Sequence, residues 1–212
     1  MTLGNCIDEY LEKVPLSEPV TTDEIYAYIL SKIPNASKGS FNSAMQRYEK
    51  GSKGLARFQK GVYYKKFDTP FGDTGIDVAE MVRRTYIMDG DEVIGYERGP
   101  SFMNKVGLTT QVPALMYLAT MKTRYVREDP RYFLSLSRPV TQITKENFRY
   151  LQFLDLIENK EKVNVEASDP EAIMRGLLKR YGLSIGKLLS YAKFYKSIEV
   201  YEGLSSIAEG LS

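Results

Sequence analysis

Apolar residues recur at helical spacing in consecutive segments at the start of the chain. The first segment, residues 4–14, ends before Pro15. The second segment opens with Thr21-Thr22-Asp23-Glu24 and ends before Pro34. This opening matches a capping box, in which the threonine accepts a hydrogen bond from the helix and the glutamate returns one. Two helices separated by a short connection are therefore predicted.

A third helix and a hairpin complete this region. The helix is predicted to begin after Ser37, to run to about Lys50, and to stop at Gly51. Two short strands joined by a turn are predicted at residues 55–58 and 62–64. Three helices followed by a hairpin is the order of elements in a winged helix-turn-helix.

The stretch 68–75, DTPFGDTG, is rich in Pro, Gly and Asp and predicts a linker between a first domain, 1–67, and a second domain, 76–212. Helices are predicted in the second domain near 76–88, 100–106, 148–157, 168–181, 185–195 and 198–208, and strands at 116–121 and 132–136. The segment 148–157 is apolar on most sides, so its helix should be deeply buried. The expected fold class is α+β and mostly α-helical: a winged helix-turn-helix followed by an α/β domain with a helical tail.

Charge is segregated along the first domain. Residues 32–66 carry nine Lys or Arg against one acid, a net charge of +8, whereas the whole chain is only +2. Residues 1–31 carry six acids against one lysine, a net charge of −5. A basic strip beside an acidic segment is the electrostatic pattern of a surface that faces duplex nucleic acid.

The third predicted helix supplies candidate contacts to the bases. On a helical wheel, Phe41, Ala44, Met45 and Tyr48 form one apolar stripe, and polar residues lie opposite. Polar side chains of this kind reach both base edges and phosphates. The candidate DNA-binding residues of this helix and the hairpin are Lys38, Asn42, Ser43, Gln46, Arg47, Lys50, Lys53, Arg57, Lys60 and Lys65.

Other interpretations of the same pattern stay open. The polar face could be an ordinary solvated surface, or the domain could bind RNA. In the second case Tyr63 and Tyr64 could stack on bases, although strand alternation favours Tyr64 as a core residue. A winged helix that binds protein is disfavoured, because protein interfaces are depleted in lysine.

The composition excludes several kinds of chemistry. The 212 residues contain one cysteine and no histidine, so an intramolecular disulfide, a cysteine zinc site and histidine acid–base catalysis are excluded. No phosphate-binding glycine-rich motif is present. The first 20 residues include four acids and no apolar run, and no apolar run reaches about 18 residues, the length that predicts a membrane span. We therefore expect a cytoplasmic protein that is not an enzyme and needs no cofactor or metal.

A second cluster of polar residues lies in the segment 95–113, GYERGPSFMNKVGLTTQVP. Gly99 and Gly107 bracket a short predicted helix that has Pro100 at its start. The segment is either a well-capped helix with a hydrogen-bonded loop or a surface for a partner or ligand. A third interpretation is that Glu97 and Arg98 act as a carboxylate and an oxyanion clamp, which requires both side chains in one cleft. The candidate residues are Glu97, Arg98, Asn104, Thr109, Thr110 and Gln111.

This segment resembles the central motif of the AbiEi-type antitoxins, the antitoxin halves of type IV toxin–antitoxin (abortive infection) pairs and related bacterial proteins. The order of motifs is also similar, with an R-x-x-x-G-V-Y-Y segment at 57–64 before it and NFRYLQ at 147–152 after it. The resemblance covers roughly residues 20–160.

The resemblance implies a DNA-binding autorepressor whose second domain opposes a nucleotidyltransferase-like toxin, without a stable complex being required. The expected partners are double-stranded operator DNA, that toxin as a functional partner, and a second copy of the chain in a homodimer, with no membrane. The alternative is a nucleic-acid-modifying enzyme whose second domain is catalytic.

Overall fold

The computed structural model describes residues 2–51, 54–70, 72–160 and 163–210. The fold is α+β, and the chain divides into two compact units, Met1–Met81 (unit 1) and Val82–Ser212 (unit 2). Each unit has its own apolar core. The coarse fold class predicted from the sequence is therefore confirmed.

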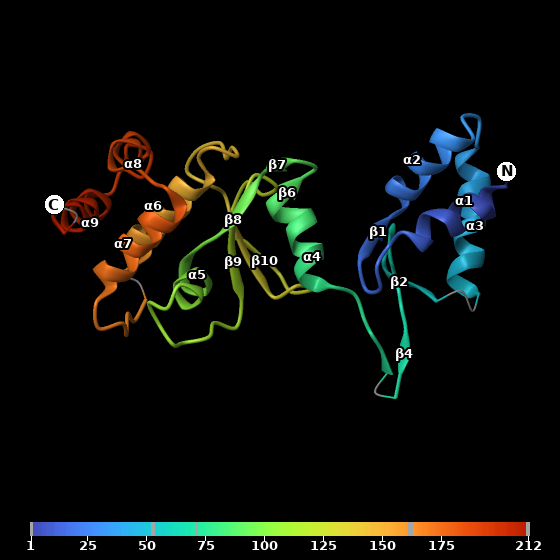
Figure 1. Cartoon of the computed structure of the whole chain (residues 1–212), viewed down its shortest axis with the longest axis horizontal. Helices are drawn as coiled ribbons and strands as arrows, with labels where there is room; N and C mark the ends of the chain where they lie inside the picture. Colours follow the sequence, from blue (N-terminus) through green and yellow to red (C-terminus); the bar gives the residue numbers. More distant parts are fainter. Residues whose placement is uncertain (1, 52–53, 71, 161–162, 211–212) are drawn as a thin grey trace. The chain divides into compact units, whose positions relative to one another are not determined.

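Unit 1 begins with helices and ends with short strands (Figure 1). Its main elements are α1 (Leu3–Glu12), β1 (Pro19–Thr21), α2 (Thr22–Lys32), α3 (Lys38–Lys50), β2 (Leu55–Gln59) and β3 (Val62–Lys65). The three predicted helices and both predicted strands are present. Gly61, in the turn between β2 and β3, has φ +79°, a conformation that glycine adopts without steric cost.

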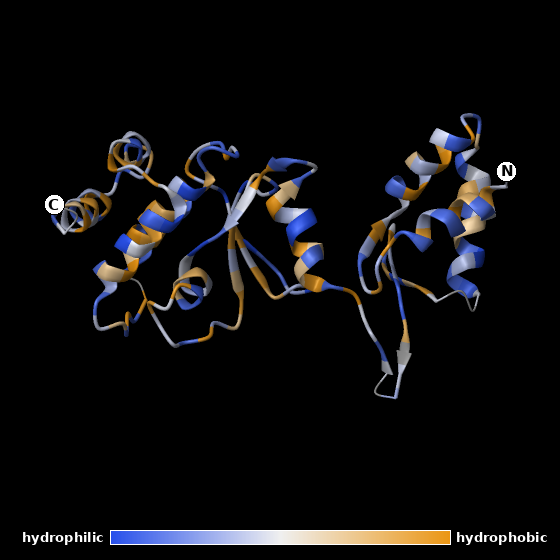
Figure 2. Cartoon of the chain, viewed as in Figure 1, coloured by the Kyte–Doolittle hydropathy of each residue, from blue (hydrophilic) through white to orange (hydrophobic). Residues whose placement is uncertain are grey.

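Capping and burial explain where these helices lie. Thr21 and Glu24 form the predicted capping box at the start of α2, and Ser37 caps α3 through the backbone N–H of Ser40. On α3, the predicted apolar stripe of Phe41, Ala44, Met45 and Tyr48 is buried. Figure 2 shows the same division of helices into apolar and polar sides.

A third strand, β1, was not predicted. It pairs antiparallel with β3, so the sheet has the order β1-β3-β2, with Val20 opposite Tyr63. Three residues that include a proline carry no strand periodicity, which is why the pattern was missed. The extra strand covers β3, and both Tyr63 and Tyr64 are buried. Tyr63 is therefore not available to stack on bases.

The segment 68–75 is not an extended linker. Within it, β4 (Asp68–Thr69) and β5 (Gly72–Asp73) form a small antiparallel hairpin. The Thr74 backbone N–H donates to the Phe67 carbonyl at 3.1 Å, and the Asp77 N–H donates to the Ser17 carbonyl at 2.8 Å. The first bond closes the hairpin, and the second joins the residues after it to the segment between α1 and β1. The division falls later, between Met81 and Val82.

Unit 2 combines a mixed four-stranded sheet and a two-stranded sheet, β6-β7, with helices. The helix predicted near 76–88 is present as α4 (Val78–Val82), which crosses the division, and it continues as a π-helical turn, η1 (Arg83–Ile87). The strands are β6 (Met88–Asp89), β7 (Glu92–Val93), β8 (Gly95–Glu97), β9 (Met116–Thr120), β10 (Arg127–Asp129) and β11 (Leu134–Ser137). The remaining helices are α5 (Gly99–Lys105), α6 (Phe148–Lys160), α7 (Pro170–Tyr181), α8 (Ile185–Ala192) and α9 (Ile198–Glu209).

The helix α6 lies at the centre of unit 2. The main sheet has the order β10-β11-β9-β8, in which β11 runs parallel to β9 and the other neighbours are antiparallel. One side of α6 packs on β8 and α5, and α8 and α9 pack on its other sides (Figure 1). All residues from Tyr150 to Ile157 are buried, which confirms the predicted deep burial of this helix. None of the helices described in the two units is long and apolar enough to cross a membrane.

Candidate functional sites

The outward face of α3 in unit 1 carries the predicted polar residues. The buried stripe fixes the rotation of the helix, so the residues opposite it must point outward. The exposed residues on this helix include Lys38, Asn42, Ser43, Gln46, Arg47 and Lys50. Because α3 packs on β2, the helix and the β2–β3 hairpin form one continuous part of the unit.

The hairpin cations differ in their surroundings. Arg57 and Lys60 are exposed, and Arg57 Nη1 lies 3.7 Å from Glu49 Oε1. By contrast, Lys65 Nζ donates a 2.9 Å hydrogen bond to the Val14 carbonyl, which ties it to the residues after α1. Lys53 lies outside the described residues. Arg57 and Lys60 are therefore the hairpin side chains best placed to meet a phosphate.

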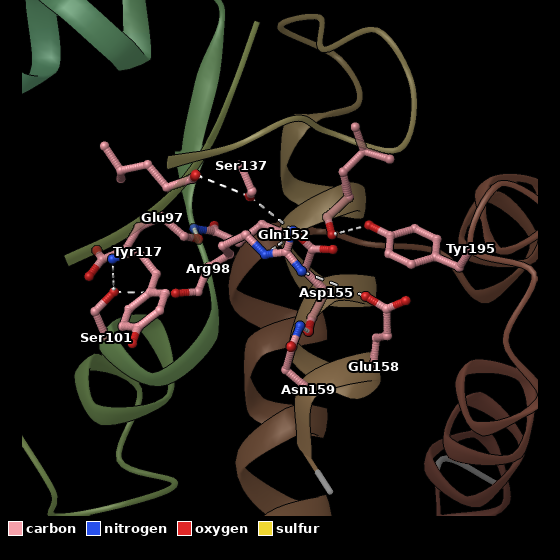
Figure 3. A network of polar contacts seen from close by, with 12 residues as sticks. Glu97, Arg98, Ser101, Tyr117, Ser137, Gln152, Asp155, Glu158, Asn159 and Tyr195 are labelled. Atoms are coloured by element: carbon pink, nitrogen blue, oxygen red, sulfur yellow. Dashed lines mark hydrogen bonds and ion pairs between the residues drawn. The ribbon is translucent and has the colours of Figure 1, made fainter. Parts of the chain in front are cut away.

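A buried ion pair organises unit 2. The backbone of Arg98 lies at the start of α5, where its N–H donates to the Tyr117 carbonyl on β9. Its side chain reaches α6, with Nε 3.2 Å from Asp155 Oδ2 and Nη2 3.6 Å from Glu158 Oε2. Nη1 donates to Ser137 Oγ on β11 at 3.2 Å. Figure 3 shows the guanidinium between the strands and α6. Arg98 thus links β11 and α6 to the start of α5.

Burial dominates the electrostatics of this ion pair. The Asp155 side chain is 1% exposed, and this loss of solvent raises its pKa to about 6, although Arg98 opposes the rise. Burial alone would lower the pKa of Arg98, but the charge of Asp155 raises it above its usual value. The phenols of Tyr96 and Tyr195 are also buried beside Asp155, and burial raises the pKa of both well above 10. The group is a polar cluster that is largely buried inside the unit.

Glu97 and Arg98 do not share a cleft. The Glu97 carboxylate pairs with Lys105 Nζ at 3.0 Å, whereas the Arg98 guanidinium turns toward α6. The Glu97 carbonyl instead accepts a 2.7 Å hydrogen bond from Gln152 Nε2. The interpretation of these two residues as a carboxylate and oxyanion clamp in one cleft is therefore wrong.

The other motif residues hold a loop in place. Asn104 Nδ2 donates to the Thr109 carbonyl at 3.2 Å, and the Gln111 N–H donates to Thr109 Oγ1 at 3.2 Å. The Glu166 carboxylate accepts a 2.7 Å bond from the Thr110 N–H and a further bond from the Thr110 hydroxyl. These hydrogen bonds from Thr110 lower the pKa of Glu166. Asn104, Thr109, Thr110 and Gln111 therefore build one hydrogen-bonded loop, separate from the Arg98 cluster.

Several residues of the unit 2 sites were not predicted. Gln152 and Asp155 lie on the segment 148–157, which was expected to be deeply buried, and a buried polar side chain needs a partner. That requirement could have identified these residues from the sequence as members of a polar contact. Glu158 follows the predicted end of this helix and is partly exposed. Ser137 and Glu166 carried no such signal, because each is distant in sequence from the residues that it contacts. Among the described residues, no group of three or more acidic or cysteine side chains could hold a metal ion.

No protein-family model matches the chain, and no curated protein matches its sequence. The resemblance to the AbiEi-type antitoxins therefore rests on the motifs quoted above.

Proposed function

We propose that unit 1 is a winged-helix domain that binds duplex DNA, and that the protein is a transcriptional autorepressor. One observation carries this proposal: the outer face of α3 is exposed, polar and basic. It consists of Asn42, Ser43, Gln46, Arg47 and Lys50. Amide side chains suit adenine and guanidinium suits guanine, so a helix with this face can read the major groove.

The sheet of unit 1 supports the same proposal. Because β1 pairs with β3, the β2–β3 hairpin is anchored to the helical part of the unit. With α3 in the major groove, Arg57 and Lys60 on this hairpin would meet the phosphate backbone. Contacts to phosphate hold a protein on the duplex but carry no sequence information. In this proposal, Gln46 and Arg47 on α3 read the sequence, and Lys50 and the hairpin cations hold the protein on the phosphate backbone.

The salt dependence of binding to a duplex from the protein's own promoter tests the proposal. If Lys50, Arg57 and Lys60 each neutralise one phosphate while Arg47 contacts a base edge, log Kobs against log salt has a slope of about −0.9 per contact, or roughly −2.7. Fluorescence anisotropy between low and moderate salt measures this slope. A slope near zero would contradict the proposal.

Two substitutions separate reading from positioning. Gln46→Ala should cost about 1–3 kcal/mol on the preferred site and relax the choice of sequence, because it removes a base contact. Lys60→Ala should weaken binding to all duplexes alike. If Lys60→Ala changed the preferred sequence while Gln46→Ala had no effect, α3 would not be the reading helix.

We propose further that unit 2 opposes a nucleotidyltransferase-like toxin. The antitoxin-like motif, residues 95–113, lies wholly within unit 2, which has its own core. Expression of residues 82–212 beside a nucleotidyltransferase encoded next to the gene should protect cells from that toxin. A folded fragment that fails to protect cells from this toxin would contradict the antitoxin role proposed for unit 2.

A further inference from the structure

A hollow of about 420 Å³ opens on unit 2 beside, but not within, the Arg98 cluster. Small-molecule sites in proteins are typically about 300–1,000 Å³, so this hollow has room for an organic ligand. Its apolar wall includes Tyr96, Phe102 and Phe148. Its polar lining is formed by Glu97, Lys105, Arg149, Gln152, Arg180 and Tyr181.

The guanidinium of Arg149 is held in a fixed position at this hollow. Its Cζ lies 4.3 Å from the ring centre of Tyr181 and 4.8 Å from that of Phe148. Its Nη1 donates a 2.8 Å hydrogen bond to Gln152 Oε1. A guanidinium that is already ordered loses little side-chain entropy when it binds an anion.

Gln152, which accepts the hydrogen bond from Arg149, is itself held in place. The residue is 4% exposed, and its Nε2 donates to the Glu97 carbonyl on β8 at 2.7 Å. Both ends of the amide are therefore engaged, and the chain of hydrogen bonds runs from β8 through Gln152 to Arg149. Buried polar chains of this kind orient the groups that they contact.

The charge balance of the lining favours an anion. Among the described residues that line the hollow, three carry a positive charge and one carries a negative charge. The Glu97 carboxylate pairs with Lys105 at 3.0 Å, so these two largely offset each other. Arg149 and the exposed Arg180 then leave a net charge of +2. A phosphate monoester carries about −1.5 to −2 at pH 7, which matches this charge.

We propose that this hollow binds a small phosphate monoester with an apolar or aromatic body. Arg149 and Arg180 would receive the phosphate, and the aromatic wall would contact the organic part. The inference goes beyond the proposed DNA binding and antitoxin activity, because it concerns a ligand site in unit 2 that neither requires. Arginine suits such a site because its planar donors match phosphate oxygens in pairs.

Isothermal titration of the full-length protein tests the site with three probes: adenosine 5′-monophosphate, adenosine and inorganic phosphate. The nucleotide should bind more tightly than either of its parts, because it engages the cations and the aromatic wall together. No measurable heat with the nucleotide at millimolar concentration would overturn the proposal. Inorganic phosphate as tight as the nucleotide would overturn the assignment of an organic body.

Two variants and a matched control locate the site. Arg149→Gln and Arg180→Gln should each weaken nucleotide binding by about tenfold or more, since each removes a charge-assisted hydrogen bond. Arg124→Gln removes the same charge from an exposed arginine of unit 2 outside this hollow and should leave the affinity unchanged. An equal loss in all three variants would show binding to net charge and overturn the site.

If Arg149→Gln disturbs the fold, Arg180→Gln still tests the site, because Arg180 is exposed and its substitution should leave the fold intact. Circular dichroism of each variant establishes folding before titration. A folded Arg180→Gln variant with unchanged nucleotide affinity would overturn the proposed contact between Arg180 and the phosphate. In the wild-type protein, nucleotide binding should also shift the Nε–Hε NMR signal of Arg149. Because DNA binding by unit 1 needs neither arginine, failure here leaves the proposed DNA binding unaffected.

Discussion

Asp155 is a carboxyl group buried between a cation and two phenols. Its charged form loses solvent on folding, and the attraction of Arg98 offsets only part of that loss, so its pKa rises to about 6. Removing one partner of a buried ion pair generally costs about 3–5 kcal/mol, since the other charge is left without compensation. Because the pKa of Asp155 differs between the folded and unfolded states, the stability of unit 2 depends on pH.

The raised pKa predicts how stability changes between about pH 4 and pH 6. In this window the folded state holds a proton on Asp155 that the unfolded state has released, so the free energy of unfolding falls as pH rises. A pKa change from 3.8 to about 6 corresponds to a loss of about 3 kcal/mol across the window. Above about pH 6 this contribution is constant.

Asp155→Asn removes the titrating group and serves as the reference. Urea unfolding of both proteins at several pH values between 4 and 7 measures the difference. We expect the wild-type free energy of unfolding to fall relative to that of the variant as pH rises. Parallel profiles would mean that Asp155 titrates near its ordinary pKa in the folded protein. Glu158, Arg98, Tyr96 and Tyr195 remain in both proteins, so the comparison isolates the one carboxyl group.

At the scale of elements, β8 is held very close to its neighbours. Gly95 begins this strand and pairs with Thr120 on β9. A Cβ at this position would lie 2.0 Å from the Tyr86 carbonyl oxygen of η1 and 2.9 Å from the Ala119 carbonyl oxygen. Both obstacles are backbone atoms, which cannot rotate away. Glycine is therefore required here by close approach of the π-helical turn.

Gly95→Ala should lower the free energy of unfolding by about 1–3 kcal/mol or more, because the added methyl group forces the backbone of η1 or β9 to move. Gly176→Ala is the matched control: a Cβ at Gly176, inside α7, meets nothing within 4 Å. That variant should be more stable by about 0.5–1 kcal/mol, since alanine favours helix. Chemical unfolding of the two variants measures both effects. An unchanged or higher stability of Gly95→Ala would contradict the close approach of the Tyr86 carbonyl to this position.

Sequence patterns predicted the long elements better than the short ones. The capping box at Thr21, the stripe on α3 and the buried helix α6 followed from periodicity and caps, which are local properties. The strands β1, β8 and β10 have three residues each, too few to show an alternation. Their positions depend on partners elsewhere in the chain. The same limit applies to Glu166, whose contact with Thr110 joins residues 56 positions apart.

At the scale of the whole molecule, the division of the chain lies later than its composition indicates. A stretch rich in Pro, Gly and Asp suggested an independent linker at 68–75, but turn-forming residues serve a tight hairpin equally well. Tyr64 OH contacts the Asp73 carboxylate at 3.5 Å, and Thr74 and Asp77 donate backbone hydrogen bonds within unit 1. Composition alone cannot distinguish these two outcomes.

Fragments that end at different residues test the division. Residues 1–81 should be more stable than residues 1–70, because the shorter fragment lacks the hydrogen bonds made by Asp73, Thr74 and Asp77. Each lost hydrogen bond should cost roughly 1 kcal/mol. Urea unfolding of both fragments measures the difference. Equal stability of the two would place the end of the folded unit before β4.

The position of β11 has a consequence for the newly synthesised chain. This strand is the last of its sheet to be made, yet it lies between β9 and β10. When β8 and β9 have emerged and paired, the far edge of β9 still has free N–H and C=O groups, and it carries the apolar residues Leu118 and Ala119. An open apolar edge is a template for pairing with another chain. Between the emergence of Thr120 and that of Ser137 from the ribosome, nascent chains of this protein therefore carry an open apolar edge that can pair with a neighbouring chain on a polysome.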